Sequence, residues 1–323
     1  TMEFKIIEEI WKIFKRDPKE LLGIDDSVAV KLFGKENILV MNVDTFDETT
    51  DWLPGLSFYD VGWKSTISSL SDVVVKGGKP LGCLVSLGIP NTLSTESIRE
   101  FYLGVRDVCK EHGLRLWGGD LNESKVFYAS VVSVGLAKKV IPRNGAKPGD
   151  VVFSTGLFSI NSLAYKILLN GLSPPDRFNI DHVYRPKIPT FQKWSNFLSY
   201  ITSSIDSSDG LALSLNLLAK ASKVKIVIDE ELVLDPFFKE ICEKIGLDPL
   251  RLALYEGGEE YTFLFTVHNE YEKNVLKEAE AVDLEVYKIG YVDQGEGVWV
   301  KRREGKIEKV HERGWIQGER WGL

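Results

Sequence analysis

A turn-rich stretch near the middle of the chain divides the sequence into two parts that each carry their own apolar segments. It runs from Ala137 to Asp150, ends in Lys-Pro-Gly-Asp, and shows no apolar periodicity. The length of 323 residues exceeds that of one typical domain. With 44% hydrophobic residues, the chain has enough apolar side chains for two cores. We therefore expect two domains, over residues 1–140 and 141–323.

The first part predicts an α+β domain, because its strand-like and helix-like segments come in groups. Strand-like runs rich in β-branched residues occupy residues 28–33, 37–45, 81–88, 114–117 and 127–136. Apolar residues recur at helical spacing over residues 4–14 and 94–112. A third helix is expected over residues 59–75.

The second part predicts an α/β domain, because strands and helices follow one another along the chain. Strand-like runs are found at residues 151–155, 223–229, 261–267 and 287–292, and helices are expected at 160–169, up to about Tyr200, 235–245 and 270–281. The leucines between Leu211 and Ser222 alternate, which permits a strand. The length of this run and its Ala, Leu and Lys content favour a helix.

Charge and cysteine content exclude several classes of protein. The net charge of −7 and the pI near 5.4 argue against general binding to nucleic acid or to an anionic membrane. Three widely spaced cysteines without a C-x-x-C pair suit a reducing compartment, and no stretch approaches 18 apolar residues. These features predict a cytoplasmic protein that does not enter the membrane.

Several common catalytic motifs are missing from the sequence. The four histidines are isolated, and there is neither a G-x-x-x-x-G-K-[ST] loop nor a G-x-G-x-x-G loop. Histidine-based catalysis is therefore not expected. A protein of this sequence that handles nucleotides needs another way to hold phosphate.

The segment from Asp206 to Gly210, Asp-Ser-Ser-Asp-Gly, places two carboxylates directly before the Leu-rich run. One Asp at such a place caps a helix, but a second carboxylate nearby adds repulsion unless a cation lies between the two. An EF-hand is excluded, because the twelfth position counted from Asp206 is Leu217, where that loop needs a glutamate. We expect Asp206 to bind metal and Asp209 either to bind metal or to cap the helix.

Asp72 is the most informative single acid in the first part. Lys64, Ser68, Ser71 and Asp72 share one face of the expected helix, at i, i+4, i+7 and i+8, and three valines follow Asp72. An aspartate near the C-terminal end of a helix opposes the helix dipole, and buried acids are rare unless they are paired or bound to metal. This pattern favours a functional role for Asp72.

Further acids stand next to the ends of expected strands or in glycine-rich turns. They are Asp25, Asp26, Asp44, Asp120, Glu259 and Glu260. Convergent aspartates that hold Mg²⁺ are one way to bind a triphosphate without a phosphate-binding loop. We hypothesise that these acids converge in the folded chain.

Taken in order, these segments resemble the thiamine-monophosphate kinase family over about residues 4 to 321. The resemblance rests on Gly-Ile-Asp-Asp26-Ser-Val-Ala-Val, Val-Asp44-Thr, Leu-Ser-Asp72, Phe-Tyr102, Gly-Gly119-Asp120, Ser-Thr-Gly156, Ile-Asp206-Ser-Ser-Asp209-Gly-Leu and Gly-Gly-Glu259-Glu-Tyr. The wider superfamily includes aminoimidazole ribonucleotide synthetase, selenophosphate synthetase and a hydrogenase-maturation enzyme.

The resemblance implies a two-domain fold like that of aminoimidazole ribonucleotide synthetase, with an α+β N-terminal domain, an α/β C-terminal domain, and a homodimer formed through the N-terminal strands. It also implies a phosphotransferase that moves the γ-phosphoryl group of ATP directly onto thiamine monophosphate. ATP is the implied co-substrate and several Mg²⁺ ions are the implied cofactors.

The resemblance also implies roles for individual residues. The implied metal ligands are Asp26, Asp44, Asp72, Asp120, Asp206 and Asp209, of which Asp72, Asp120 and Asp206 are the expected catalytic residues. The implied nucleotide contacts are Tyr102, Gly119, Asp120, Arg143 and Ser208. The implied substrate contacts are Asp51, Glu259 and Trp315.

The sequence departs from the family pattern mainly on the acceptor side. Asn42-Val43 replaces two hydroxyl residues, Asp51 stands where the family carries a histidine, and Glu260 replaces an aspartate. Two alternatives therefore stay open: an ATP-using enzyme of the same superfamily with another acceptor, or an ATP-binding paralogue without catalysis.

Overall fold

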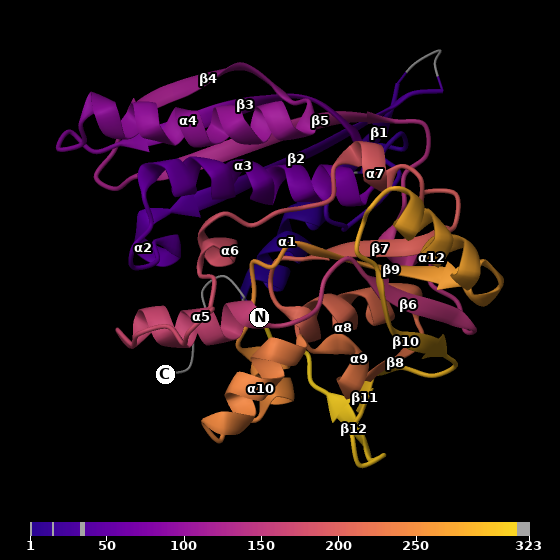
Figure 1. The fold of residues 1–323 in the computed structure, drawn as a ribbon. Helices are drawn as coiled ribbons and strands as arrows, with labels where there is room; N and C mark the ends of the chain where they lie inside the picture. Colours follow the sequence, from indigo (N-terminus) through magenta and orange to yellow (C-terminus); the bar gives the residue numbers. More distant parts are fainter. Residues whose placement is uncertain (1, 15, 33–35, 315–323) are drawn as a thin grey trace.

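A computed structural model describes residues 2–14, 16–32 and 36–314 and contains two β-sheets with their helices (Figure 1). In the view of Figure 1 the elements before residue 140 lie mainly in the upper half and those after residue 150 in the lower half. Within the described ranges, no helix is both long and apolar enough to cross a membrane.

The first sheet has five strands in the order β1-β2-β5-β3-β4. Their bounds are β1 Val28–Lys31, β2 Ile38–Asp47, β3 Lys79–Ile89, β4 Arg115–Glu123 and β5 Tyr128–Ala137. Neighbouring strands are antiparallel except for β3 and β4, which are parallel. A parallel pair needs a crossover, which the helix α4 (Thr95–His112) supplies. The sheet therefore matches the α+β prediction for the first part.

Two long helices cover one face of this sheet. Helix α3 (Phe58–Val75) begins with a capping box formed by Ser57 and Asp60, and α4 ends at Gly113, whose φ is +67°. The buried side chains of Val85 and Leu87 pack in the same core as those of both helices. Fully burying an aliphatic side chain of this kind stabilises a fold by about 1.5–3 kcal/mol.

The opposite face of the first sheet and its β4 edge carry exposed apolar side chains. Every residue of β4 is exposed. The exposed apolar residues of this face and edge, which we call the β4 surface, are Val43, Leu84, Leu116, Trp117 and Leu121. Leu116 and Leu121 pair with the buried Cys83 and Leu87, so they project from the edge strand toward the helix-covered side. In the expected sequence pattern β4 ended at Trp117; in the structure it continues to Glu123 and includes Gly119 and Asp120.

The second sheet has seven strands in the order β12-β11-β8-β10-β6-β9-β7. Their bounds are β6 Asp150–Ser154, β7 Ile201–Ser207, β8 Lys225–Asp229, β9 Thr262–His268, β10 Tyr287–Asp293, β11 Gly297–Lys301 and β12 Ile307–Val310. The pairing of β8 with β11 is parallel and the other pairings are antiparallel.

The remaining helices are distributed between the two parts of the chain. Their bounds are α1 Met2–Ile13, α2 Glu48–Asp51, α5 Ile160–Leu169, α6 Asp181–Tyr184, α7 Phe191–Trp194, α8 Leu211–Ser222, α9 Glu230–Val233, α10 Pro236–Lys244, α11 Pro249–Tyr255 and α12 Glu272–Ala281, with 3₁₀ turns η1 Arg143–Gly145 and η2 Asn269–Tyr271. The expected helix reaching Tyr200 was too long, because α7 has four residues.

Helix α8 confirms the helical interpretation of the Leu-rich run, and Leu211, Leu215 and Leu218 are buried on it. Asp206 lies inside strand β7, five residues before α8, and the N-cap residue of α8 is Gly210 rather than an acid. Gly210 has φ +100°, a conformation that glycine adopts without steric cost.

The two parts of the chain meet where the C-terminal end of α3 contacts β7. The Ser71 hydroxyl donates to an Asp206 carboxylate oxygen at 2.6 Å, and the Ser204 hydroxyl donates to the Val75 carbonyl oxygen at 2.9 Å. Both hydrogen bonds cross between residues on opposite sides of the predicted boundary. Polar groups from both parts therefore meet at a buried place.

Candidate active site at the domain junction

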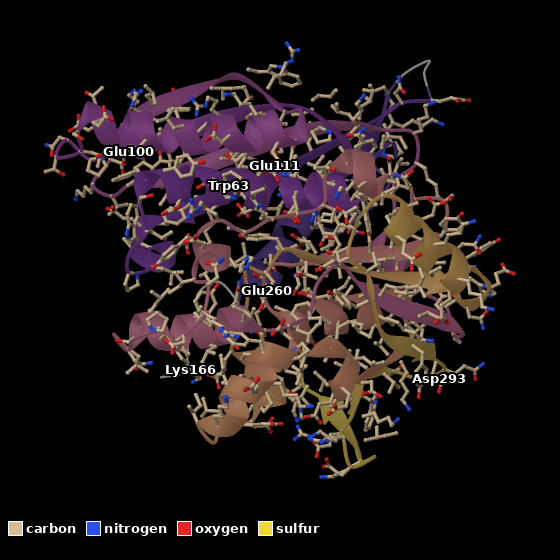
Figure 2. All side chains as sticks on the ribbon, viewed as in Figure 1. Trp63, Glu100, Glu111, Lys166, Glu260 and Asp293 are labelled. Atoms are coloured by element: carbon tan, nitrogen blue, oxygen red, sulfur yellow. The ribbon has the colours of Figure 1, made fainter. Side chains whose placement is uncertain are left out.

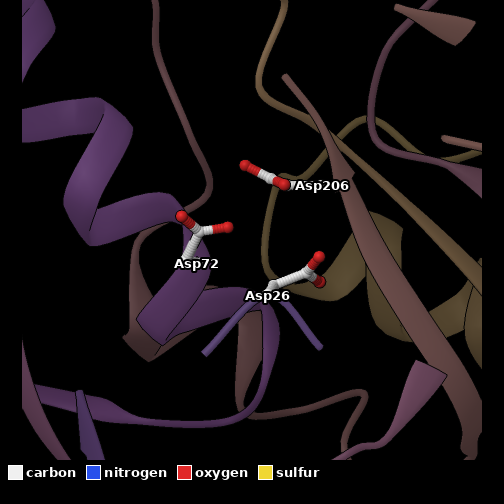
Figure 3. Close-up of side chains that lie close together, drawn as sticks. All are labelled: Asp26, Asp72 and Asp206. Atoms are coloured by element: carbon white, nitrogen blue, oxygen red, sulfur yellow. The ribbon is translucent and has the colours of Figure 1, made fainter. Parts of the chain in front are cut away.

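Three carboxylates converge at this junction, and we call Asp26, Asp72 and Asp206 the acidic cluster. Each offers one oxygen, and these oxygens all lie within 4.8 Å of one another (Figure 3). Asp26 comes from the loop before β1, Asp72 from the last turn of α3 and Asp206 from β7. The cluster therefore exists only when the loop, the helix and the strand of the second sheet are assembled.

Polar neighbours hold each member of the acidic cluster. Asp206 accepts the Ser71 hydroxyl, and Asp72 accepts the Asn42 side-chain amide at 2.5 Å. The Arg143 guanidinium donates to Asp26 in a close ion pair. Asn42, which stands where the family pattern has a hydroxyl residue, therefore contacts a cluster carboxylate through its side-chain amide.

The pKa values of the three cluster carboxylates are shifted in different directions. Burial, followed by the charges of Asp206 and Asp26, raises the pKa of Asp72 well above its ordinary value. Burial and then Asp26 raise the pKa of Asp206 to about 7. Burial also acts to raise the pKa of Asp26, but the charges of Arg143 and Lys76 outweigh it and the pKa is lowered. Three carboxylates this close repel one another when all are ionised.

The donor set fits a hard divalent cation such as Mg²⁺. All three groups offer carboxylate oxygens, which Mg²⁺ prefers over nitrogen or sulfur. Among the described residues, the buried Asp26 Oδ2 contacts the Lys76 ammonium at 2.9 Å in an ion pair and accepts no further hydrogen bond. A bound cation would satisfy this oxygen and relieve the repulsion, and its binding would release protons from the cluster.

Among the described residues, two other expected metal ligands, Asp44 and Asp209, lie outside the acidic cluster. Asp44 projects to the helix-covered face of the first sheet, since its register partner is the buried Val131. Burial raises its pKa to about 6, against a hydrogen bond with Ser68. Asp209 follows β7, and a Cβ on Gly314 would lie 2.3 Å from its carbonyl oxygen.

Asp51 and Glu259, both expected to contact the acceptor, lie in one neighbourhood. The Lys64 ammonium binds Glu259 Oε2 at 2.6 Å, and the side chain of Lys64 is only 2% exposed. The Tyr165 hydroxyl donates to the same oxygen at 2.8 Å. Burial raises the pKa of Asp51, and the charges of Glu259 and Lys64 also act on it. We call Asp51, Lys64, Tyr165 and Glu259 the Glu259 group.

The glycine-rich turn before β9 presents Glu259 in an unusual backbone conformation. Its φ is +54°, and its amide donates to the Ser208 carbonyl oxygen at 2.6 Å. The next residue, Glu260, lies near the centre of the molecule in Figure 2. Its carboxylate accepts the Ser159 hydroxyl, and burial raises its pKa to about 7. The turn therefore places Glu259 beside the Asp206–Asp209 segment.

The expected nucleotide contacts fall into two places in the chain. Arg143 and Ser208 lie at the domain junction, Arg143 on Asp26 and Ser208 against the Glu259 turn. Tyr102, by contrast, lines a cavity of ≈ 440 Å³ between α4 and β4, together with Leu116. Trp315, expected at the substrate, lies outside the described residues.

Gly119 and Asp120 lie with the second group, on β4. Asp120 is in register with Ser86 and Gly118 with Leu84, and Leu84 is exposed on the face away from the helices. Paired positions of neighbouring strands point to the same face. Asp120 and Asp44 therefore project from opposite faces of the first sheet, and one chain does not bring Asp120 into the acidic cluster. A Cβ on Gly119 would lie 1.8 Å from the Val85 carbonyl oxygen, so the close approach of β3 requires glycine.

Sequence reasoning missed four residues of these sites: Asn42, Lys64, Lys76 and Tyr165. Lys64 was assigned to the polar stripe of α3 without a partner. Lys76 follows three buried valines, and a lysine that continues a buried run was a readable sign of a buried ion pair. Tyr165 carried no such sign, since an aromatic residue in a helix ordinarily indicates packing.

The chain matches two family models that together cover most of its length. Residues 24–137 match the N-terminal domain of AIR synthase related proteins, and residues 147–301 match the C-terminal domain of the same proteins. Two solved structures of the hydrogenase maturation protein HypE share the fold at 18% identity, with TM-scores of 0.71 and 0.70.

Curated relatives and solved structures narrow the class. The chain is 35% identical to the thiamine-monophosphate kinase of Nitrosopumilus maritimus, with 95% of this chain and 96% of that protein aligned, and 33% identical to that of Aquifex aeolicus, with 97% of each aligned. The structure of AaThiL complexed with AMPPCP and TMP is 31% identical, covers 97% of this chain and 96% of its own, and superposes with a TM-score of 0.82. The chain therefore belongs to the AIR synthase related family, and within it to the thiamine-monophosphate kinases.

Proposed function

We propose that this protein is a phosphotransferase that phosphorylates thiamine monophosphate with ATP. The observation that carries the proposal is the acidic cluster, formed by three carboxylates from three elements beside the Glu259 group. A relative of 31% identity binds an ATP analogue together with TMP, which supports the same pair of substrates here. The products are thiamine diphosphate and ADP.

The proposed reaction is an in-line transfer. An oxygen of the thiamine monophosphate phosphate attacks the γ-phosphorus of ATP, and the bond from that phosphorus to the bridging oxygen breaks, with ADP as the leaving group. Mg²⁺ held by Asp26, Asp72 and Asp206, with Asp44 and Asp209 nearby, would neutralise phosphate charge. The cluster carboxylates would act on the phosphates only through the bound cations.

The charge on the acceptor side suits the proposed substrate. Asp51 and Glu259 set two carboxylates beside a single ammonium, that of Lys64. A surplus of negative charge favours a ligand that carries a cation, and the thiazolium ring of thiamine is one. We also propose Trp315 as a substrate contact, because of the family resemblance.

We propose that the working form is a homodimer. Tyr102, Gly119 and Asp120, all inferred to contact nucleotide or metal, lie on the β4 side and not at the acidic cluster of the same chain. The β4 surface is apolar and exposed, as an interface between two copies is before assembly. A second copy packed on it would bury these side chains and bring its own Asp120 to the neighbour's open face.

The chain contains three buried free cysteines among its described residues, and the proposed reaction consumes ATP. Both features support a cytoplasmic location. The proposed division into residues 1–140 and 141–323 follows the two sheets, the first ending at β5 and the second beginning at β6.

The decisive experiment is an assay with ATP, Mg²⁺ and thiamine monophosphate, in which ADP and thiamine diphosphate are measured by chromatography. We expect stoichiometric formation of both products. ADP formation with other phosphate acceptors but not with thiamine monophosphate would support an enzyme with another acceptor. Asp51, which stands where the family pattern has a histidine, is the reason to test that alternative. ATP binding without any product would indicate a non-catalytic paralogue.

A further inference from the structure

Lys76 is a completely buried lysine next to the acidic cluster. It directly follows α3 as its C-cap residue, and its side chain is 0% exposed. The ammonium lies 2.7 Å from Asp25 Oδ1 and 2.9 Å from Asp26 Oδ2, and it donates to the Ser204 carbonyl oxygen at 2.6 Å. The ammonium therefore forms two ion pairs with carboxylates and one hydrogen bond with a backbone carbonyl.

The position of this ammonium gives it an influence on cation binding. Asp26, whose Oδ2 lies 2.9 Å from the ammonium, is also a member of the acidic cluster. Arg143 binds the other oxygen of Asp26. With Asp25 included, four carboxylates face two fixed cations, which leaves a formal surplus of two negative charges when every group is ionised. One divalent cation balances that surplus.

We propose that Lys76 is a resident cation of the acidic cluster that limits divalent-cation binding in the absence of nucleotide. Its charge repels a cation bound at Asp26, so that tight loading requires the added negative charge of a bound triphosphate. The inference rests on the proposed magnesium site, and it assigns Lys76 as a positioning residue that couples metal binding to nucleotide binding.

A purely structural role for Lys76 makes the opposite prediction. Because Lys76 also joins the two parts of the chain through Ser204, its loss would then disorder Asp25 and Asp26 and weaken metal binding. In our proposal its loss removes a repulsive charge a few ångströms from the bound cation and tightens binding. The sign of the change separates the two roles.

The test is calorimetric titration of Mn²⁺ or Mg²⁺ into the full-length protein without nucleotide, for wild type and Lys76→Met. Methionine keeps most of the apolar stem and removes the charge. We expect the variant to bind the ion about tenfold more tightly. We also expect a non-hydrolysable ATP analogue to tighten metal binding by a larger factor in wild type than in the variant. The negative charge of the analogue offsets the Lys76 ammonium in wild type, and the variant has already lost that ammonium.

Two controls accompany this variant. Lys79→Met removes an exposed lysine three residues further on, and metal affinity should change less than twofold. The double variant Asp25→Asn/Lys76→Met removes the buried pair together, so the net charge of the site is kept if Lys76→Met alone does not fold. It should still bind metal more tightly than wild type, because Lys76 contacts the ligand Asp26 directly.

The outcomes distinguish this inference from the proposed function. Unchanged or weaker metal binding by folded Lys76 variants, with wild-type binding that Asp206→Asn abolishes, overturns the role of Lys76 and leaves the metal site standing. Absence of any metal binding that depends on Asp206, with or without the nucleotide analogue, overturns the magnesium site and the role of Lys76 together. Tighter binding by the variants with reduced coupling to the analogue supports the inference.

Discussion

The acidic cluster and the β4 surface are both part of the proposed site, yet they differ in almost every physical respect. The side chains of the cluster are buried or half-buried, ionisable and held by Ser71, Asn42 and Arg143. The residues of β4 are exposed throughout, and most of its large side chains are apolar. One chain therefore completes the first region by folding, whereas we propose that a second copy covers the second region.

The largest effect should come from the cluster. Asp72→Asn removes one proposed metal ligand and one repulsive charge, so turnover should fall about a thousandfold or more while the fold remains at least as stable. Steady-state kinetics and thermal melting measure the two quantities. Near wild-type turnover in the purified variant would contradict the metal role and remove the main distinction between the two regions.

Substitution on the β4 surface should act through assembly. Leu121→Glu places a charge at an edge-strand residue that is 63% exposed, so the single chain should lose less than about 0.5 kcal/mol of stability. We expect light scattering to show monomers in place of dimers, with turnover reduced about a hundredfold if the partner's β4 side contributes to the site. Leu169→Glu, at a residue 64% exposed on α5, is the matched control and should leave the dimer intact. A monomeric wild-type protein with full activity would show that β4 needs no partner.

A smaller and more selective effect is expected in the Glu259 group. Lys64→Met leaves the half-buried carboxylate of Glu259 without its ammonium partner. Glu259 is then no longer held in position on the proposed acceptor side. The KM for thiamine monophosphate should rise about tenfold, with the KM for ATP nearly unchanged. Equal changes in both KM values would mean that this group does not belong to the acceptor side.

The smallest effect should appear in the pH dependence of stability without metal. The pKa of Asp206 is raised from 3.8 to about 7, so the folded state holds a proton that the unfolded state has released between these values. This group stabilises the fold most below pH 4, and its contribution is lost as the pH rises to about 7. The melting temperature measured at pH 5 and at pH 8 should therefore differ less in Asp206→Asn than in wild type. Asp120→Asn, on exposed β4, should keep the wild-type difference.

The sequence predicted the long helices and strands well. It identified the acidic residues of the proposed site but missed residues that contact them. The polar stripe on α3 correctly placed Asp72 in the last turn of a buried helix, because helical periodicity is a local property. The Leu-rich run was correctly interpreted as a helix. The sequence did not place Asp206 in a strand, because strand β7 forms by pairing with β9, a contact between segments about 60 residues apart.

The sequence by itself determined the family, the two-part organisation and the set of acids that hold the proposed site, since these depend on residue identities in a fixed order. Only the tertiary structure decided which of them meet. Asp26, Asp72 and Asp206 converge because α3 crosses β7 at the junction, whereas Asp120 is carried to the other face of the first sheet by the two-residue period of strands β3 and β4. The charges that accompany the cluster, Lys76 above all, became visible only with burial, because the electrostatic role of a lysine depends on the solvent that surrounds it.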